Sequence, residues 1–236
     1  MRGLAPQVDP THYLRGYDSP GRFASYWYQV EEAVRLGGRV VEIGIGNGTV
    51  TAALRARGLE VTTVDLDPEL GPDVVGDIRQ LPFPAGSFDT VLAAEVLEHL
   101  PWAEVGGAIT EIARVAIRGA VVSVPDREVA LSIMGRIPNA LQITRLGLQR
   151  RVPVRLALWA LLAPVSWRRG GHVRAIASID PLHPSPRCDQ HYWELGLGGV
   201  RRDNIIAMME KGGLRVARDY RVLENPYHHL FIGTVA

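Results

Sequence analysis

One short segment constrains the fold of this chain more than any other: an apolar run that ends in alternating glycines. Arg39–Ile43 (RVVEI) is nearly continuous in apolar residues, which is typical of a parallel strand buried on both faces. Gly44, Gly46 and Gly48 follow, and Thr49–Arg57 has a helical pattern. Glycines let the backbone turn sharply and approach a ligand, and a helix N-terminus favours an anion. The segment predicts a ligand site, because a tight turn alone does not need three glycines.

Strand and helix patterns alternate along most of the chain. Apolar runs predict strands at Arg39–Ile43, Glu60–Asp65, Asp73–Val75, Phe88–Ala94, Gly119–Val124, Arg215–Val222 and His229–Val235, and helical patterns occupy Thr49–Arg57, Ala103–Val115 and Arg201–Lys211. This alternation predicts an α/β fold with a doubly wound seven-stranded sheet. The sheet should be mostly parallel with an antiparallel last strand, because no helix separates the last two strands.

The 236 residues suffice for a single domain spanning 1–236. We expect residues 1–37 to form an N-terminal helical segment, with a helix from Gly21 onward. The spacing of its apolar residues predicts one buried face, made of Phe23, Trp27, Val30 and Val34. Residues from about 126 to 192 interrupt the alternation, and we expect a mostly helical cap inserted there.

The composition excludes several kinds of site and argues against secretion and a membrane span. Cys188 is the single cysteine, so neither an intrachain disulfide nor a zinc site built on several thiolates is available. The first residues have no apolar core of a secretion signal, and no uncharged apolar stretch reaches the roughly 18 residues of a membrane span. We therefore expect a cytoplasmic protein.

Acidic residues lie at the ends of the first two predicted strands. Glu42 precedes the glycines, where it would repel a bound pyrophosphate but suits the ammonium group of S-adenosylmethionine (SAM). The G-x-G-x-G spacing also differs from the G-x-G-x-x-G of dinucleotide sites. Asp65 ends the second strand, where a carboxylate can accept both ribose hydroxyl protons. Asp67 precedes Pro68, so we expect it to cap a short helix.

Asp77 follows the third predicted strand. Its carboxylate could accept the exocyclic amine of adenine, with Leu66 and Ile78 on either side of the ring. The alternative is an aspartate that forms a turn.

At this point the motifs resemble a known family. VVEIGIGNG, VDLD, GDIRQLPFPAGSFDTVLAAEVLEHL and VVSVPDRE are similar to class I SAM-dependent methyltransferases, which have a Rossmann-like fold, and in particular to the branch of the ubiquinone and menaquinone biosynthesis methyltransferases. The resemblance covers about 40–127 and is weaker over 201–236. It implies that the methionine moiety is held by Glu42, Gly44, Gly46 and Gly48. Asp65 would bind the ribose and Asp77 the adenine. Ala94 and Glu95 would line the sulfonium side, and Tyr17 and Tyr26 would form a lid over the cofactor. The two tyrosines could equally be core aromatics of an amphipathic helix.

Glu95, Glu98 and His99 form an E-x-x-E-H cluster at the end of the fourth predicted strand. His99 could be a general base, since histidine titrates near neutral pH. The three side chains could also ligate a hard divalent cation such as Mg²⁺. This option resembles the quinone O-methyltransferases and the small-RNA 3′-end methyltransferases, with His172 or His191 as a further ligand. The cluster could also only shape the pocket, and our primary expectation includes no metal.

Two later clusters are rich in polar and aromatic residues. His191 and Tyr192 lie where the cap rejoins the sheet and are candidates for the acceptor pocket, with hinge packing as the alternative. The segment Pro226–His229 precedes the last strand, and we interpret it as a turn.

The inserted segment is strongly basic. Eight arginines and no lysine or acid lie between Val129 and Ile179, so the segment carries +8 and the remainder −7, for a net charge of +1. It could be a lid over the active site, a surface that docks on an anionic membrane, or a site for an anionic substrate. Few aromatics accompany the arginines, which argues against single-stranded nucleic acid.

Together these features predict an enzyme that transfers a methyl group from SAM to a small or lipid-like acceptor by in-line displacement. The alternatives are a SAM-binding regulatory protein without turnover and an NAD-dependent oxidoreductase, which the glycine spacing and Glu42 disfavour.

Overall fold

The computed structural model describes Tyr13 and residues 17–128, 131–134, 176–179 and 190–235. The chain divides into two compact units. One comprises residues 1–130 together with 181–236, and the other comprises residues 131–180.

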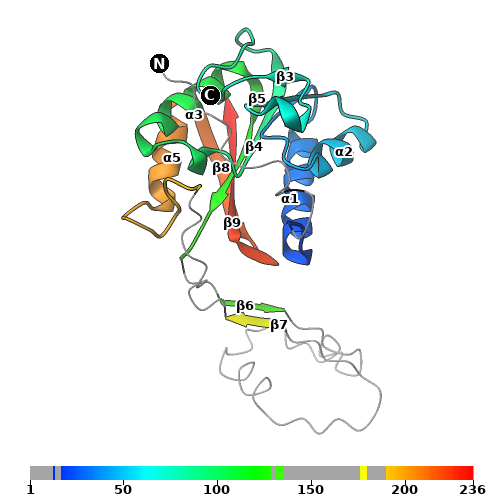
Figure 1. Cartoon of the computed structure of the whole chain (residues 1–236). Coiled ribbons are helices and arrows are strands. Elements are labelled where there is room, and N and C mark those ends of the chain that lie inside the picture. The colour runs from blue at the N-terminus through cyan, green and yellow to red at the C-terminus, as the bar shows by residue number, and fades with distance from the viewer. Residues whose placement is uncertain (1–12, 14–16, 129–130, 135–175, 180–189, 236) are drawn as a thin grey trace, which may run out of the picture. The chain divides into compact units, whose positions relative to one another are not determined.

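The first unit is built on a seven-stranded sheet (Figure 1). Its strands are β1 (Val40–Ile43), β2 (Val61–Asp65), β3 (Val74–Val75), β4 (Phe88–Ala94), β5 (Ala116–Pro125), β8 (Leu214–Val222) and β9 (Asn225–Val235), in the order β3-β2-β1-β4-β5-β9-β8. The first five pair in parallel, and β9 is antiparallel to both β5 and β8. This confirms the predicted α/β sheet and its antiparallel last strand. All four residues of β1 are buried, as its apolar sequence predicts.

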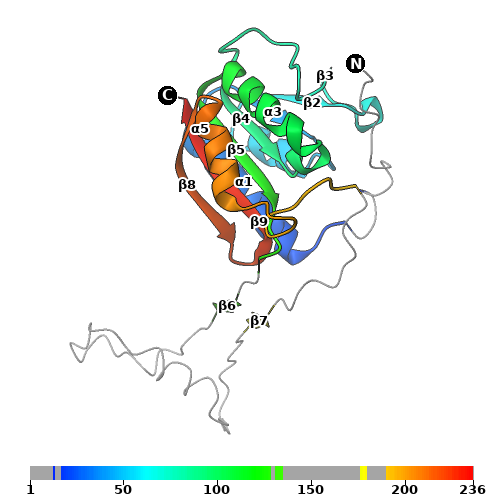
Figure 2. The same cartoon turned by 90° about the vertical axis from the view of Figure 1, so that its left-hand side faces the viewer.

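Helices cover both faces of this sheet. They are α1 (Pro20–Leu36), α2 (Thr49–Ala56), α3 (Trp102–Val115) and α5 (Arg202–Lys211), with short 3₁₀ helices η2 (Pro68–Leu70) and η3 (Leu97–His99). Helices α1 and α2 lie on one face and α3 and α5 on the other (Figures 1 and 2). Val30 and Leu54 bring the first pair into one apolar cluster, and Ile109 and Met209 bring the second pair into another.

Helix α1 begins as predicted but buries a different face. Ser19 caps it by accepting the N–H of Arg22 at 3.1 Å, and Pro20 fits the first turn. Of the predicted buried face, Val30 is buried, whereas Phe23 and Trp27 are 53% and 52% exposed. The prediction is wrong for these two aromatic residues.

Polar partners explain the difference. The buried face of α1 includes Ser25, whose Oγ accepts from the Asn225 amide at 3.0 Å, and Glu32, which accepts from the Tyr220 hydroxyl at 2.7 Å and from Arg218. Because these groups remain hydrogen-bonded, α1 can bury them. A helical pattern of apolar residues does not contain that information.

In the second unit the structure describes two strands. β6 (Leu131–Met134) and β7 (Ile176–Ile179) pair antiparallel. The insertion was expected to be mostly helical, and these two strands are not helical. Residues 135–175, which include most of the basic segment, lie outside the described residues.

No helix within the described part of the chain has both the length and the apolar character needed to cross a membrane.

Candidate functional site

A cavity of about 190 Å³ lies in the first unit, at the carboxyl ends of the central strands. The chain crosses from one side of β1 to the other here, since β2 and β4 flank β1, and open α/β sheets bind ligands at such a point. Its lining includes these predicted residues: Tyr17, Tyr26, Glu42, Gly44, Gly46, Asp65, Leu66, Asp77, Ile78, Ala94, Glu95 and His99. Gly48, His191 and Tyr192 are not among the residues that line the cavity in the described structure.

The glycine loop wraps closely around this cavity. Gly44 has φ +81°, and a Cβ atom there would lie 2.5 Å from Cγ2 of Val96. Both conditions require glycine. Gly48 has a left-handed conformation at the N-cap of α2, so its place in the fold is the start of the helix.

Glu42 lies in β1 beneath the loop. Its carboxylate is buried and accepts a hydrogen bond from the Thr51 hydroxyl at 2.5 Å. Burial raises the pKa of Glu42 to about 7. An ammonium group in the cavity would favour the charged carboxylate.

Asp65 ends β2, and both of its carboxylate oxygens accept backbone N–H groups. Oδ2 accepts from Ile45 at 2.9 Å and Oδ1 from Asp67 at 3.0 Å. Burial raises the pKa of Asp65, against the effect of these bonds. Each oxygen retains a lone pair for a further donor. The predicted role of Asp67 as a cap is confirmed, since it accepts the N–H of Glu69 at 2.9 Å at the start of η2.

Asp77 lines the cavity and also forms a turn. Oδ1 accepts the backbone N–H of Arg79 at 2.9 Å, and Oδ2 pairs with the guanidinium at 2.5 Å. The side-chain bonds from Arg79 lower the pKa of Asp77. The carboxylate is therefore charged and rigidly held at this end of the cavity, where Leu66 and Ile78 also lie.

An aromatic group from the N-terminal segment closes another side. The guanidinium of Arg22 stacks 3.9 Å above the ring centroid of Tyr17, and Tyr13 packs edge-on against the same ring. The Tyr26 hydroxyl donates to Asp18 at 2.9 Å. All three tyrosines and Arg22 line the cavity, although the sequence analysis did not single out Tyr13 or Arg22.

Glu95 contacts other partners than the remaining residues of its motif, Glu98 and His99. It is a non-glycine residue with positive φ, +54°. Its Oε1 accepts from the Ser123 hydroxyl at 2.7 Å, and its Oε2 lies 3.7 Å from Nε2 of His228. Burial raises the pKa of Glu95 to about 7 and lowers that of His228 to about 3. His228 therefore has a neutral ring.

His228 lines the cavity, yet the sequence analysis placed it in a turn. A signal for it was available. In β9 it shares the alternation of Leu230 and Ile232, so a buried polar residue stands in an apolar row.

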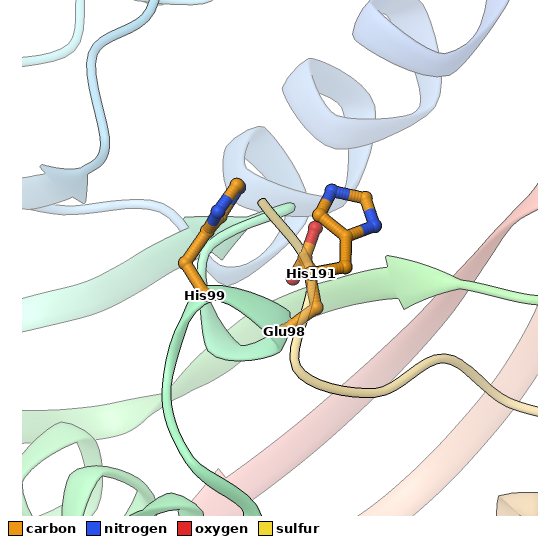
Figure 3. Close-up of side chains that lie close together, drawn as sticks. All are labelled: Glu98, His99 and His191. Carbon is orange, nitrogen blue, oxygen red and sulfur yellow. The ribbon is translucent and has the colours of Figure 1, made fainter. Parts of the chain in front are cut away.

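A different set of side chains forms the candidate metal group. Glu98, His99 and His191 each offer one ligand atom, and these atoms lie within 4.8 Å of one another (Figure 3). Glu95 is not in this group, and His172 lies outside the described residues. The rings of His99 and His191 pack edge-to-face with centroids 4.9 Å apart.

Both histidines of this group are held at Nδ1. His99 Nδ1 lies 3.1 Å from the Gln190 carbonyl oxygen, and His191 Nδ1 lies 2.8 Å from a carboxylate oxygen of Glu194. Metal-binding histidines typically have such a partner on the nitrogen that faces away from the metal. Burial, followed by the proximity of His191, lowers the pKa of His99 to about 4, so its ring is neutral.

The segment that carries His191 is anchored to η3 through its backbone. The N–H of Tyr192 donates to the Glu98 carbonyl at 2.9 Å. Tyr192 itself is 47% exposed. Glu194 is buried and also accepts from the Tyr227 hydroxyl at 3.0 Å and from Arg127. This network fixes the His191 segment against the end of β5.

Comparison with known proteins agrees with this geometry. A family model described as a methyltransferase domain matches residues 41–124. The chain is 32% identical over 107 residues to an uncharacterized methyltransferase of Mycobacterium sp. (strain JLS), covering 40% of this chain and 42% of the relative. It is 31% identical over 126 residues to the ubiquinone biosynthesis O-methyltransferase of Xanthomonas euvesicatoria pv. vesicatoria (strain 85-10), covering 47% and 49%. The chain thus spans about half the length of the curated relatives it matches, or less.

Solved structures of other methyltransferases have a similar fold. Magnesium protoporphyrin IX methyltransferase from Synechocystis PCC 6803 with bound S-adenosylhomocysteine (SAH) has a TM-score of 0.56 at 18% identity, covering 92% of this chain and 84% of that one. The Burkholderia thailandensis 1,6-didemethyltoxoflavin-N1-methyltransferase has a TM-score of 0.55 at 14% identity, covering 99% and 93%. These likenesses show the Rossmann-like fold of the methyltransferases.

Proposed function

We propose that this chain, which carries a class I SAM-dependent methyltransferase domain, transfers a methyl group from SAM to a small or lipid-like acceptor. The observation that carries the proposal is that Glu42, Gly44, Asp65 and Glu95 all line the cavity at the carboxyl ends of β1, β2 and β4. A glycine loop preceded by a buried acid suits the amino acid end of SAM, and an acid at the end of β2 suits its ribose.

The cofactor would lie across these strand ends. Glu42 and the glycine loop would hold the methionine moiety, and Asp65 would accept hydrogen bonds from the ribose hydroxyls. Asp77 would take the adenine amine, with Leu66 and Ile78 against the ring. Ala94 and Glu95 would line the sulfonium side, and Tyr17 and Tyr26 would cover the cofactor.

The reaction is an in-line displacement. A lone pair of the acceptor forms the bond to the methyl carbon while the bond from that carbon to sulfur breaks, which leaves SAH. The main contribution of the protein is alignment, which can supply roughly 7–11 kcal/mol. His99 lines the cavity with a neutral ring, so it can accept the proton of an acceptor that is protonated at working pH. His191 and Tyr192 would contribute to the acceptor side through their segment.

Calorimetric titration of the full chain with SAH tests the proposal, with NAD as the control. Binding of SAH and no binding of NAD would support it. Binding of NAD in place of SAH would favour the oxidoreductase, and binding of neither would reject the site. SAH binding without product from any acceptor would favour a regulatory protein.

A second proposal concerns Glu98, His99 and His191 as cation ligands. The proposal rests on the ligand atoms of these three residues, which lie within 4.8 Å of one another, and on the hydrogen-bond partners that orient both rings at Nδ1. Two imidazoles and one carboxylate suit Mn²⁺, Fe²⁺ or Zn²⁺ better than Mg²⁺, which prefers oxygen ligands. A cation bound here would lower the pKa of an acceptor hydroxyl.

Two expectations rest on the sequence alone: that the acceptor is lipid-like, and that residues 129–179 contact an anionic membrane.

A further inference from the structure

Gln29 lies near the middle of α1, on the side of the helix that faces the cavity. Arg22, Tyr26 and Gln29 are spaced by four and three residues, so they share one side of α1, and all three line the cavity. The first two have partners in the fold, since the guanidinium of Arg22 stacks on Tyr17 and the Tyr26 hydroxyl donates to Asp18. The row brings a third polar side chain, that of Gln29, to the cavity wall.

The amide of Gln29 is buried but not sealed. The residue is only 3% exposed. Among the described residues its side chain has no hydrogen-bond partner, and neither atom of its amide belongs to the buried polar atoms that are closed off from open space. The small surface that Gln29 exposes therefore includes its amide, and the cavity is the space that this residue lines. Native structures rarely bury a polar group without a partner, and one that reaches a cavity points to a ligand.

The surroundings of Gln29 place it at one end of the cavity. Val30, the next residue, belongs to the same apolar cluster as Val50 in the first turn of α2 and Leu92 in β4, and these two also line the cavity. Leu92 is paired with Glu42 across β1 and β4. The start of α2 and Glu42 mark the end that the proposed function gives to the methionine moiety. The adenine would lie near β3, at the edge of the sheet on the far side of β2.

The chemistry of a primary amide matches this end of the cofactor. The amino-acid end of SAM carries an ammonium, which only donates, and a carboxylate, which only accepts. Glu42 can accept from the ammonium, but a charged carboxylate has no donor for the carboxylate of the cofactor. The amide of Gln29 has an acceptor oxygen and two N–H donors, so it can bind both groups. We propose that Gln29 hydrogen-bonds the amino-acid end of SAM, an inference that rests on the proposed function and adds a contact from α1 to the cofactor.

Calorimetric titration of the full chain with SAH and with 5′-methylthioadenosine tests the inference. The second compound keeps the adenosine and the sulfur atom but lacks the amino-acid end. Gln29→Met keeps the length of the side chain and removes its hydrogen bonds. We expect this variant to bind SAH at least about tenfold more weakly than the parent, which corresponds to one hydrogen bond to a charged group, and to bind 5′-methylthioadenosine like the parent. Unchanged SAH affinity, or equal losses for both compounds, would overturn the inference.

Thermal unfolding without ligand separates a binding residue from a structural one. Gln29→Met should unfold at a temperature no lower than the parent, because it removes a buried amide that has no partner among the described residues. Val30→Ala is the matched control, since Val30 is buried beside Gln29 on α1 and is not among the residues that line the cavity in the described structure. It should show the opposite pattern, a lower unfolding temperature and the SAH affinity of the parent.

Two outcomes of these measurements reject different claims. A loss of stability in Gln29→Met equal to that in Val30→Ala would show a structural glutamine and reject the inference. Failure of the parent chain to bind SAH would instead reject the proposed function itself.

Discussion

The carboxylate of Asp65 accepts the backbone N–H of Ile45 at 2.9 Å, which ties the end of β2 to the middle of the glycine loop. The second oxygen of Asp65 holds the N–H of Asp67 in the same way at 3.0 Å. One side chain thus positions two segments of the cavity wall and still faces the cavity with free lone pairs. Its removal should affect ligand binding more than the fold.

Asp65→Ala should weaken SAH binding by roughly 2–4 kcal/mol, because it removes charge-assisted hydrogen bonds to two ribose hydroxyls. Calorimetry measures the change. Glu60→Ala is the control, since Glu60 is an exposed acid directly before the same strand, and the affinity of this variant should equal that of the parent. Equal affinities of both variants would refute the assignment of Asp65 to the ribose.

Glu42 should make the stability of the chain depend on pH. Burial raises its pKa from 4.5 to about 7, so between these values the folded state binds more protons than the unfolded state. The contribution of Glu42 to the free energy of unfolding should therefore fall by up to about 3 kcal/mol as pH rises from about 4.5 to 7. Denaturant unfolding across this range measures the slope.

Glu42→Gln should flatten part of that slope and be more stable than the parent at pH 8. Glu95, whose pKa is also raised to about 7, and His99 and His228, whose pKa values are lowered to about 4 and 3, titrate in both proteins. The difference in slope between the parent and Glu42→Gln therefore reports Glu42. An unchanged slope in Glu42→Gln would show that Glu42 is charged throughout the range.

Gly44→Ala should destabilise the chain and abolish tight SAH binding. The change forces a left-handed conformation on alanine, which costs about 1–2 kcal/mol, and brings a Cβ atom to 2.5 Å from Val96. Gly58→Ala is a matched control, because Gly58 has the same φ of +81° but an added Cβ there meets no described atom within 4 Å. Thermal unfolding should show a larger loss for Gly44→Ala. Equal losses would mean that the loop can move away from Val96.

Binding of a divalent cation should depend on Glu98, His99 and His191. After treatment with a chelator, the full chain should bind Mn²⁺ in a calorimetric titration, and Glu98→Gln and His191→Ala should each weaken it by at least about tenfold. Glu95→Gln should bind Mn²⁺ like the parent, because Glu95 is hydrogen-bonded to Ser123 instead. Loss of binding in Glu95→Gln alone would favour the ligand set that the sequence motif suggested. No Mn²⁺ binding by the parent would end the proposal.

Much of the architecture follows from local patterns. The apolar run before Gly44, the cap at Asp67 before Pro68 and the alternation of strands with helices each depend on residues close together in the chain. Because parallel strands all present their carboxyl ends at one edge, the placement of Glu42, Asp65 and Glu95 in one cavity could also be expected from the sequence. These features needed no knowledge of how distant segments pack.

Tertiary packing decided the rest. Nδ1 of His99 lies next to the carbonyl oxygen of Gln190, 91 positions later in the sequence. The candidate metal group therefore contains His191, where the sequence motif had suggested Glu95. Buried hydrogen bonds from β8 and β9 determined that α1 turns Phe23 outward. The sequence by itself determined the strands, the glycine loop and the acids at the ends of the strands. These features depend on the apolar pattern and on glycines that are close together in the chain. Only the tertiary structure placed His228 in the cavity wall, because the cavity is formed by segments that are distant in sequence.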